Sequence, residues 1–595
     1  MKTIPDALPR IALPPLNVPQ VRALRWWNSA LPVVSALVIA VLGYLARWIC
    51  DDALIYTRAV EQILSGNGPV YSAGERVETS TGVLWQWLLA GAGFVSGETD
   101  TATISWMLGL ALTTAGFALA VAATQRLHPR AAAWLLPAGA VVLLALPPVW
   151  EYATSGLETG LTTCWMAGCW WLLVRLREST SGPAIAGAAF VFGLGPLVRP
   201  ELTVVALVFL AGLWLLARPG WRVVLAAAGA AAALPFGYEI FRMGYYGIVV
   251  PLPALTKNAD ASLWGRGFHY LTDFADPYFL WLPLVLLTVG LAALVRRVRA
   301  YRADLIVTLT PVVAGLLLLV YVLKVGGDYM HARMLLPVLF LLLLPVLVLR
   351  WSRTGAALAL VIVAWVPLYA GSGRYHEAPG PVRAIDDERA YYVSWTHTDN
   401  PTQTEDYTRQ QRDLAAAVEA ARKSGRRTLI YQGVHNEILT APLREDLPAR
   451  AAVVGVYLGT AGMLAPPDVA IVDFWGLANP VGARFAFPPG KPGHSKPLSN
   501  IWLLADYADP AAPVARTGNF VFQRDFDPAE LAAARHALSC GDLAEIREST
   551  REPMSLDRFW RNLTGAWDRT WVRVPPEPLA AERAFCGSGG PPQQG

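Results

Sequence analysis

The sequence predicts a polytopic, all-α membrane domain followed by an α/β domain outside the membrane. Only 16% of its residues are charged and 54% are hydrophobic, whereas a soluble globular protein is about 25% charged. Apolar runs long enough to span a bilayer recur as far as residue 371. Beyond that residue the chain turns polar and has no spanning run. The small net charge of +4 carries no signal for nucleic-acid binding.

The apolar runs are the elements of the predicted membrane domain. Their approximate ranges are 31–49, 82–96, 101–123, 131–147, 157–175, 183–198, 201–217, 221–237, 279–296, 305–323, 333–349 and 355–371. If the loops rich in arginine are cytoplasmic, all of these runs alternate correctly except 82–96. That run is short, contains Gln86 and Gly91–Gly93, and is expected to be re-entrant. We therefore expect about 11 transmembrane helices, with the N-terminus inside and the C-terminus outside.

Four regions follow from this pattern. We expect a Pro-rich cytoplasmic tail at 1–30, the transmembrane domain at 31–371, an extracytoplasmic domain at 372–585 and a disordered tail at 586–595. In the extracytoplasmic domain, RTLIYQGV, AAVVGVYLG, DVAIVDFWG and NIWLLADYA are expected strands. Helices are expected at RDLAAAVEAARKSG and after Asp527, which precedes Pro528. Cys540 and Cys586 are the only cysteines after residue 371, and outside the cytoplasm such a pair is expected to form a disulfide.

Two adjacent carboxylates open the first polar stretch after an apolar run. Asp51 and Asp52 follow the run that ends near residue 49, and a polar, Gly-rich loop containing Glu75 is expected to continue to Ser80. Charges at the edge of a membrane span are costly and tend to mark a site. The simpler interpretation, in which both residues only end a helix at the water boundary, stays open at this point.

Further charged and aromatic residues lie in loops assigned to the same outer side. They are Glu158, Arg199, Glu201, Tyr245, Lys257, Asp328, His331 and Arg333. Structural alternatives exist for several. Glu158 could be a buried polar partner of another span, Arg199 and Glu201 could pair with each other, and Lys257 could be an exposed, inert cation. Asp328, His331 and Arg333 follow two glycines, and Arg333 leads directly into an apolar run, where a cation prefers a partner.

This inventory suits an enzyme that uses a lipid-phosphate sugar donor. Carboxylates can activate a hydroxyl or stabilise an oxocarbenium-like centre, and arginine can hold a phosphodiester. The sequence contains no phosphate-binding Gly-rich loop, Ser nucleophile elbow or His-rich metal motif. A transporter is disfavoured, because the charges lie in outer loops rather than at mid-span and no repeated halves are visible.

The same residues carry a resemblance to a known family. The matching strings are WICDDALI, ILSGNGPV, GERVE, ATSGLETGL, LVRPE, FRMGYYGIVVP and GGDYMHARMLLP, followed in the tail by VDFWGLANP and PGHSK. Over about residues 40–590 the chain resembles the AftB family of terminal β-(1→2)-arabinofuranosyltransferases, which are cell-membrane glycosyltransferases with a GT-C-like fold. The resemblance implies a donor, decaprenylphosphoryl-β-D-arabinofuranose, and an acceptor, the end of an α-(1→5)-arabinan in arabinogalactan or lipoarabinomannan. It places the active site outside the cytoplasm among membrane lipids.

The resemblance also implies site roles. Asp51 and Asp52 become the catalytic candidates. Because neighbouring residues of a helix point about 100° apart, we expect them to divide the roles, with Asp51 as the catalytic carboxylate and Asp52 as an orienting or cation-binding group. A divalent cation at Asp52 stays an open alternative. The remaining outer-loop residues are expected to bind donor and acceptor. A β donor that yields a β linkage requires net retention, which one base activating the acceptor from the opposite face does not give. Two other interpretations stay open: another polyprenyl-phosphate-sugar transferase, such as a mannosyltransferase, and a non-catalytic membrane protein related to flagellar motor control.

Overall fold

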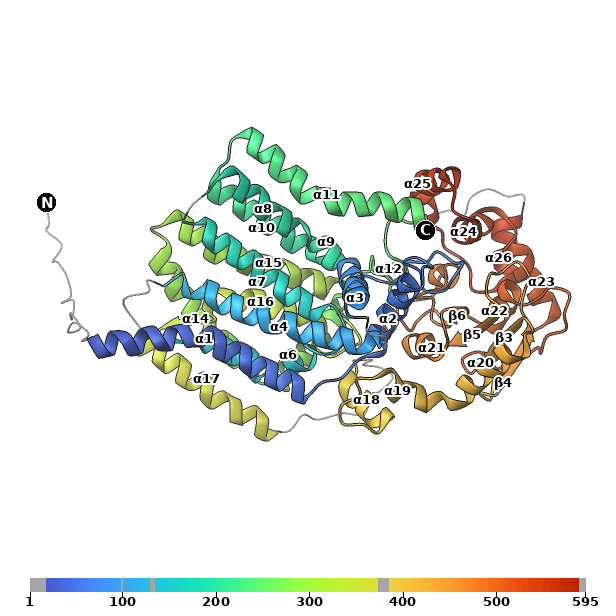
Figure 1. Ribbon diagram of the computed structural model, residues 1–595, viewed down its shortest axis with the longest axis horizontal. Coiled ribbons are helices and arrows are strands. Elements are labelled where there is room, and N and C mark those ends of the chain that lie inside the picture. The colour runs from blue at the N-terminus through green and yellow to red at the C-terminus, as the bar shows by residue number, and fades with distance from the viewer. Residues whose placement is uncertain (1–17, 98–99, 129–133, 179, 373–384, 588–595) are drawn as a thin grey trace.

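The computed structural model describes residues 18–97, 100–128, 134–178, 180–372 and 385–587 (Figure 1). Residues 1–17 of the expected cytoplasmic tail and residues 588–595 of the expected disordered tail lie outside the described residues. Long helices run side by side through one part of the molecule, and the C-terminal domain covers their ends on one side (Figure 1).

The first part is a bundle of long apolar helices. Its longer members are α1 (Val18–Leu45), α4 (Thr101–Gln125), α7 (Thr159–Leu176), α10 (Thr203–Ala217), α11 (Trp221–Tyr246), α14 (Trp281–Val298), α15 (Arg302–Val325) and α17 (Arg353–Ser372). By length and composition, six helices of the described chain can cross a membrane: Arg22–Leu45, Thr101–Gln125, Pro200–Ala217, Trp221–Tyr246, Trp281–Val298 and Arg302–Val325. The chain therefore has a helix-rich membrane part. The full count of eleven spans remains a prediction.

Two expected spans are interrupted rather than continuous. The 131–147 run contains β1 (Leu135–Leu136), α5 (Ala138–Ala145) and the start of α6 (Pro147–Glu151). The 333–349 run contains η2 (Arg333–Leu335), α16 (Leu336–Leu343), η3 (Leu344–Val346) and the start of β2 (Leu349–Arg350), which pairs with β1. Prolines lie near the breaks, and a proline disfavours the helical conformation in the residue before it. Helix α1 also begins at Val18, well before the predicted boundary near residue 31.

Shorter helices complete this part. They are α3 (Val83–Ser96), α8 (Gly182–Gly193), α9 (Gly195–Val198), η1 (Pro200–Leu202), α12 (Leu252–Thr256) and α13 (Trp264–Ala275). The expected re-entrant segment coincides with α3.

The stretch that we expected to be a polar loop from Asp51 to Ser80 is helical in its first half. Helix α2 runs from Asp51 to Leu64 with both aspartates in its first turn, where acidic side chains favour a helix start. It ends before Gly66, whose φ of +80° suits glycine. The prediction of a loop was wrong for this half, because α2 has only 14 residues and its charged residues interrupt the apolar run. Asp51 and Asp52 therefore begin a helix instead of ending the preceding one.

The C-terminal domain is built on a four-stranded sheet. Its strands are β3 (Thr428–Gln432), β4 (Ile438–Pro442), β5 (Ala451–Gly455) and β6 (Val469–Asp473) in the order β4-β3-β5-β6. Strand β3 pairs antiparallel with β4 and parallel with β5, which pairs parallel with β6. Alternate residues face two apolar cores. Ile430 packs with the core that includes Leu414 of α20 (Arg412–Ser424), and Leu429 packs with the core that includes Trp502 of α22 (Asn500–Tyr507).

Three expected strands and both expected helices are present, and one expected strand is wrong. NIWLLADYA forms α22, whose eight residues are all buried. A short, fully apolar run has no periodicity that separates a buried strand from a buried helix. Helix α23 (Pro528–Ala537) starts at Asp527, which forms a capping box with Glu530.

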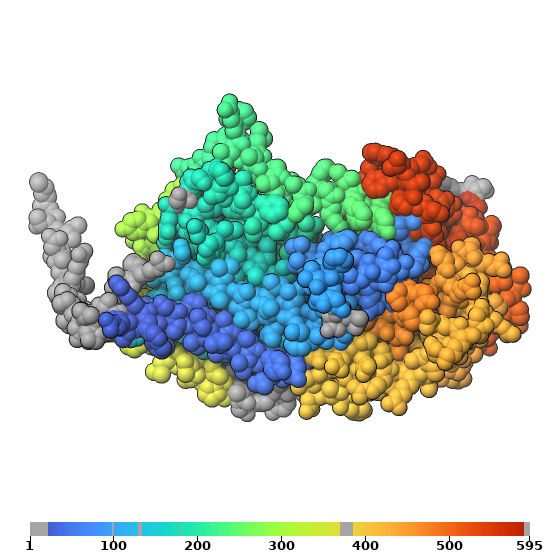
Figure 2. Space-filling model, viewed as in Figure 1, coloured from blue at the N-terminus to red at the C-terminus, as the bar shows by residue number. Residues whose placement is uncertain are grey.

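The remaining elements surround the sheet and join it to the bundle. They are α18 (Glu388–Thr396), α19 (Thr404–Thr408), η4 (Arg409–Gln411), α21 (Leu458–Leu464), η5 (Gly482–Arg484), α24 (Gly541–Arg551), α25 (Leu556–Trp571) and α26 (Pro578–Cys586). A disulfide joins Cys540 to Cys586. The two parts form a continuous surface, with blue residues of the first hundred lying against the orange and red domain (Figure 2).

Candidate active site

Asp51 is a buried contact between the two parts of the molecule. Its Oδ1 accepts hydrogen bonds from the backbone N and the Oγ1 of Thr460, both at 2.7 Å, and its Oδ2 accepts one from the backbone N of Gly459 at 3.0 Å. Burial outweighs these bonds and raises the pKa of Asp51 to about 6. Both carboxylate oxygens are thus engaged at the start of α21.

Asp52 faces a different set of groups, and both of its ion-pair partners lie in the membrane part. Its Oδ2 lies 3.7 Å from Nζ of Lys257 and 3.9 Å from Nη1 of Arg333. Successive residues of a helix point about 100° apart, which is why Asp51 reaches the C-terminal domain and Asp52 does not. Of the two carboxylates, Asp52 is the one beside the cations.

Arg333 joins Asp52 to the other predicted site residues. Its Nη1 lies 3.1 Å from Oδ2 of Asp328, and its Nη2 lies 3.4 Å from Oε1 of Glu158. Glu158 is also paired with Arg199, which is paired in turn with Glu201. We call the seven residues of this network the outer polar cluster: Asp52, Glu158, Arg199, Glu201, Lys257, Asp328 and Arg333.

The backbone before Arg333 explains how its side chain reaches the cluster. Gly326 and Gly327 have φ of +86° and +69°, and a Cβ on Gly327 would lie 2.3 Å from Cγ of Tyr270. Only glycine fits this close approach. Ala332 also has a positive φ of +64°, a costly conformation for a residue with a side chain.

A narrow apolar cavity adjoins the cluster on the bundle side. It has a volume of about 50 Å³ and lies between α4, α7, α15 and α16, with Phe117, Leu318 and Phe340 among its walls. Glu158, Arg199, Glu201 and Arg333 also line it. Among the described residues, Oε2 of Glu158 and Nε of Arg333 have no hydrogen-bond partner. These buried polar atoms are suited to contact a substrate.

A larger cavity is lined by Asp52 and lies between α2, α18 and the C-terminal domain. We call it the polar cavity, after the charged residues among its walls. Its volume is about 650 Å³. Its chemistry comes from carboxylates, cations and aromatic rings: Asp51, Asp52, Asp386, Glu388, Tyr391, Tyr457, Trp475, Lys491 and His494. Carboxylates and aromatic rings together are suited to bind a sugar through its hydroxyls and its apolar faces.

The backbone before α18 brings two of these carboxylates to Asp52. The N of Asp386 donates to the O of Tyr329 at 2.6 Å, and the N of His331 donates to the O of Asp386 at 2.9 Å. Asp386 pairs with Lys491. Burial, reinforced by the charges of Asp52 and Asp386, raises the pKa of Glu388 well above its ordinary value. A carboxyl of this kind can hold a proton and donate a hydrogen bond.

His494 stands between two aromatic rings of this cavity. Its ring centroid lies 4.9 Å from that of Tyr329 and 5.3 Å from that of Trp475. Burial, together with the nearby Lys491, lowers the pKa of His494 to about 4. The imidazole is therefore neutral near pH 7.

Three predicted binding residues lie outside this arrangement. His331 bonds through Nδ1 to Asp273 at 2.7 Å, and its Nε2 lies 3.2 Å from the hydroxyl of Tyr278. Glu75 pairs with Arg551 of the C-terminal domain at 2.9 Å. Tyr245 stacks on Phe241, with ring centroids 5.0 Å apart. These contacts are with residues that belong neither to the outer polar cluster nor to the walls of the two cavities.

The sequence alone does not point to the carboxylates and the lysine that the C-terminal segments bring to the cavity. Asp386, Glu388 and Lys491 were not singled out. Trp475 and His494 lie within two strings that carry the resemblance, VDFWGLANP and PGHSK. Those strings were the available signal, but a single sequence does not show that they fold against Asp52.

The donor set does not fit a divalent cation at the aspartate pair. Asp52 faces two cations, and Asp51 faces backbone N–H groups. Within the described ranges, one group of at least three His, Cys, Asp or Glu ligand atoms is close enough to hold an ion: His536, Cys540 and Cys586. Both cysteines of that group are in the disulfide.

Carboxylates and arginines beside two cavities, next to a helix-rich membrane part, fit a membrane glycosyltransferase. Residues 387–570 match the AftB family C-terminal domain. The chain is 36% identical over 581 residues to the terminal β-(1→2)-arabinofuranosyltransferase of Corynebacterium glutamicum, an alignment that covers 88% of this chain and 82% of the relative. It is 33% identical over 608 residues to the protein of the same name from Mycobacterium tuberculosis, covering 91% and 95%. The chain belongs to the family of terminal β-(1→2)-arabinofuranosyltransferases. No solved structure was found to match it.

Proposed function

We propose that the protein adds terminal arabinofuranosyl residues, in β-(1→2) linkage, to the arabinan ends of arabinogalactan and lipoarabinomannan during cell-wall synthesis. Membership of the family supports this activity. Asp52 opens onto a cavity of about 650 Å³, which has room for a sugar chain end. The donor is decaprenylphosphoryl-β-D-arabinofuranose.

The position of Arg333 is the observation that carries the proposal. Its guanidinium contacts Glu158 beside the apolar cavity and lies 3.9 Å from Asp52 beside the polar one. A planar guanidinium binds a phosphate through two parallel hydrogen bonds. The donor phosphate binds to Arg333 and Arg199, and the isoprenoid follows the apolar path between α7 and α15. Because the cavity there is only about 50 Å³, these helices separate when the lipid enters.

The acceptor occupies the polar cavity. Trp475, Tyr391 and Tyr457 offer aromatic surfaces to furanose rings, and Glu388 donates or accepts a hydrogen bond at a hydroxyl. The acceptor's terminal 2-hydroxyl then approaches Asp52 from this cavity, on the face of the donor sugar that carries the phosphate.

Retention follows from attack on the leaving-group side of the sugar. Asp52 lies beside the arginine assigned to the phosphate, so it stands on the leaving-group side, whereas a carboxylate nucleophile must attack from the other. Asp52 therefore takes the proton from the acceptor 2-hydroxyl. At the same time the oxygen of that hydroxyl bonds to the anomeric carbon, and the bond between the anomeric carbon and the donor phosphate breaks. Arg333 and Lys257 stabilise the charge that develops on the phosphate. This assignment exchanges the roles predicted for Asp51 and Asp52.

The protein purified into lipid nanodiscs tests the activity. It should transfer radiolabelled arabinose from the lipid donor to a synthetic α-(1→5)-arabinan, and linkage analysis should show a terminal β-(1→2) residue. Transfer of mannose from a polyprenyl-phosphate donor, without arabinose transfer, would favour the mannosyltransferase instead. No transfer from either donor by folded protein would favour a non-catalytic role.

Variants of Arg333 test the donor site in the same preparation. Arg333→Ala should weaken donor binding, and Arg333→Lys should not fully restore it, because a point charge replaces a bidentate donor. The surface change Arg422→Lys is the control and should bind donor like the parent. Parent-like donor binding and turnover by Arg333→Lys would contradict the assignment.

We also propose an orientation. The protein is a multi-pass protein of the cell membrane, with the outer polar cluster, the polar cavity and the 372–585 domain outside the cytoplasm. The distribution of arginines among the loops supports this orientation.

A further inference from the structure

Helix α25 exposes a row of tryptophans. Trp560 and Trp567 are 60% and 63% exposed, Leu556 is 81% exposed, and Trp571 is also exposed. At 3.6 residues per turn, one arc of about 60° on the helix holds all four side chains. We call these four residues the tryptophan row. Contiguous exposed apolar side chains of this size mark an interaction surface.

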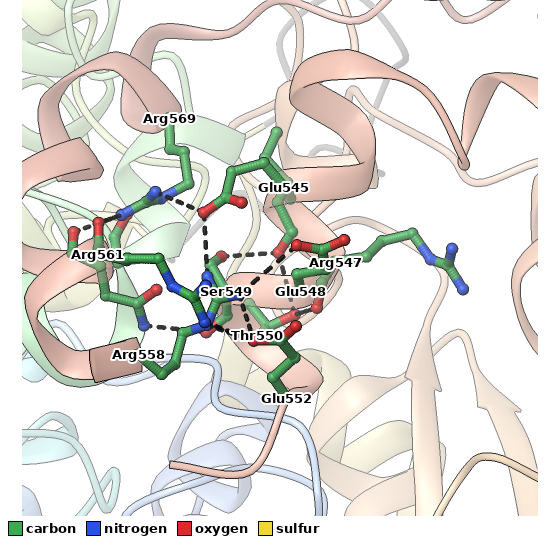
Figure 3. A network of polar contacts seen from close by, with 12 residues as sticks. Glu545, Arg547, Glu548, Ser549, Thr550, Glu552, Arg558, Arg561 and Arg569 are labelled. Carbon is green, nitrogen blue, oxygen red and sulfur yellow. Dashed lines mark hydrogen bonds and ion pairs between the residues drawn. The ribbon is translucent and has the colours of Figure 1, made fainter. Parts of the chain in front are cut away.

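The polar side of α25 faces the protein, so the helix is inverted relative to an ordinary surface helix. Arg558, Asn562 and Arg569 are buried. Glu545 of α24 accepts from Arg558 Nη1 at 3.1 Å and from Arg569 Nη1 at 2.9 Å, as Figure 3 shows. A surface helix normally buries its apolar face and exposes its polar one. The arginine network holds α25 in place with the tryptophan row directed outward.

The row is placed next to a helix that faces lipid. Helix α25 packs on the C-terminal end of α11, where a Cβ on Gly244 would lie 2.1 Å from Cε2 of Phe559. The backbone N–H of Val249, just past α11, donates a hydrogen bond to Oγ1 of Thr570 in α25 at 3.0 Å. Only 6% of the α11 spanning window is buried in the protein.

The exposed apolar surface of α11 runs up to this junction. Its exposed residues include Leu234, Phe236 and Ile240. Gly244 lies one turn beyond Ile240, about 6 Å along the helix axis. The tryptophan row therefore continues the lipid-facing surface of α11 just past its apolar end, the level at which tryptophan is enriched in membrane proteins.

We propose that α25 lies in the interfacial layer of the membrane, with the tryptophan row inserted among lipid headgroups and upper acyl chains. The C-terminal domain is thereby attached to the bilayer at a second place, in addition to its contacts with the bundle. Exposed Arg573 lies against the ring of Trp571 at one end of the row and reaches lipid phosphates, as basic side chains at such interfaces do.

Nitroxide labels in the full-length protein test this placement. Trp567→Cys and Trp560→Cys carry the label on the row, and Asp568→Cys carries it on the water-facing side of the same helix. Cys164, which is partly exposed, is replaced by Ala in all three. In nanodiscs we expect the ratio of collisions with oxygen to collisions with a water-soluble nickel chelate to be several-fold higher at 560 and 567 than at 568.

Two outcomes would overturn the proposal. Equal access of the nickel chelate at 567 and 568 would mean that the row faces water. Loss of access for both oxygen and nickel at 567 would mean that another protein or a second copy covers it. Because no side chain of the row forms a hydrogen bond among the described residues, the variants should keep the parent melting temperature in detergent, and this measurement confirms that each is folded.

Discussion

Two neighbouring carboxylates show how a single helical turn separates two roles. Asp51 is held by Thr460 and Gly459 at the junction of the two parts, whereas Asp52 lies between Lys257 and Arg333. The residues are adjacent in sequence, and only the direction of each side chain distinguishes them.

The first prediction compares these two residues. Asp52→Asn removes the proposed base and should lower the single-turnover transfer rate by roughly 100-fold or more, while the donor still binds. Asp51→Asn should lower the transfer rate less. Its main effect is to replace one carboxylate oxygen, which accepts a hydrogen bond from α21, with an amide group that donates. Rapid-quench transfer with excess enzyme gives both rates. A parent-like rate for Asp52→Asn, or a covalent arabinosyl ester on Asp52 in the quenched protein, would contradict the mechanism.

The second prediction concerns His494 and acid. Its pKa is lowered to about 4 in the folded protein, against about 6.5 in an unfolded chain. The unfolded state thus binds the proton first, and the stability linked to His494 is present above pH 6.5 and lost as the pH falls toward 4. The loss is about 3 kcal/mol at most, at 1.36 kcal/mol per pKa unit.

The test compares His494→Gln with the parent by thermal melting between pH 4 and pH 7. The variant should lose less stability across this range. Asp51, whose pKa is raised to about 6, acts with the opposite sign, because its contribution falls as the pH rises. The difference in melting temperature between variant and parent at each pH isolates the contribution of His494. Identical pH profiles of the melting temperature would refute the prediction.

At the scale of elements, the site depends on how closely α2 meets α21. Arg58 of α2 is buried and donates to the carbonyl oxygens of Ala465, Pro466 and Val469 at 2.6, 3.1 and 2.9 Å. Each of these bonds joins the membrane part to the C-terminal domain. The polar cavity lies beside this junction and needs both elements.

The third prediction widens that junction. A Cβ on Gly459 would lie 1.9 Å from the backbone O of Asp51 and 2.8 Å from Cβ of Leu54. Gly459→Ala should therefore push α21 away from α2 and lower both the melting temperature and the transfer activity. Gly187→Ala is the matched control, because it lies inside α8 with no atom within 4 Å of its added Cβ, and alanine there should stabilise the helix by up to about 1 kcal/mol. A Gly459→Ala protein as stable and active as the parent would show that the contact is not needed.

At the scale of the whole molecule, the C-terminal domain covers one end of the helix bundle, and α2, which carries Asp52, lies at that end (Figure 1). A lipid donor and a polymeric acceptor approach such a site from different phases, one through the bilayer and the other through water. Arg333 lines the apolar cavity, and Asp52, 3.9 Å from its Nη1, lines the polar cavity.

The fourth prediction is the orientation of the chain in the membrane. A reporter fused after Arg353 should read cytoplasmic, and one fused after Gly380 should read extracytoplasmic, because arginine-rich loops stay inside. A fusion at Gly97 should also read outside. A cytoplasmic signal at residue 380 would place the C-terminal domain on the wrong side for the proposed acceptor.

The sequence by itself determined the helix-rich membrane part, three of the strands and the family. Hydrophobic run length and alternation are local properties, and so is the capping box at Asp527. The sequence also pointed to the seven residues of the outer polar cluster, because charged residues next to apolar runs can be recognised without knowing the fold.

Only the tertiary structure decided which of those charges meet. His331, Glu75 and Tyr245 share the outer loops with Arg333, yet each contacts other partners, because loop residues converge through the packing of distant helices. Asp386, Glu388 and Lys491 reach the polar cavity through the docking of segments hundreds of residues after Asp52. The outward direction of the tryptophan row likewise depends on the buried arginines of α25, whose partners lie on α24. Pairings between residues far apart in sequence come from packing, and no local pattern in one chain encodes them.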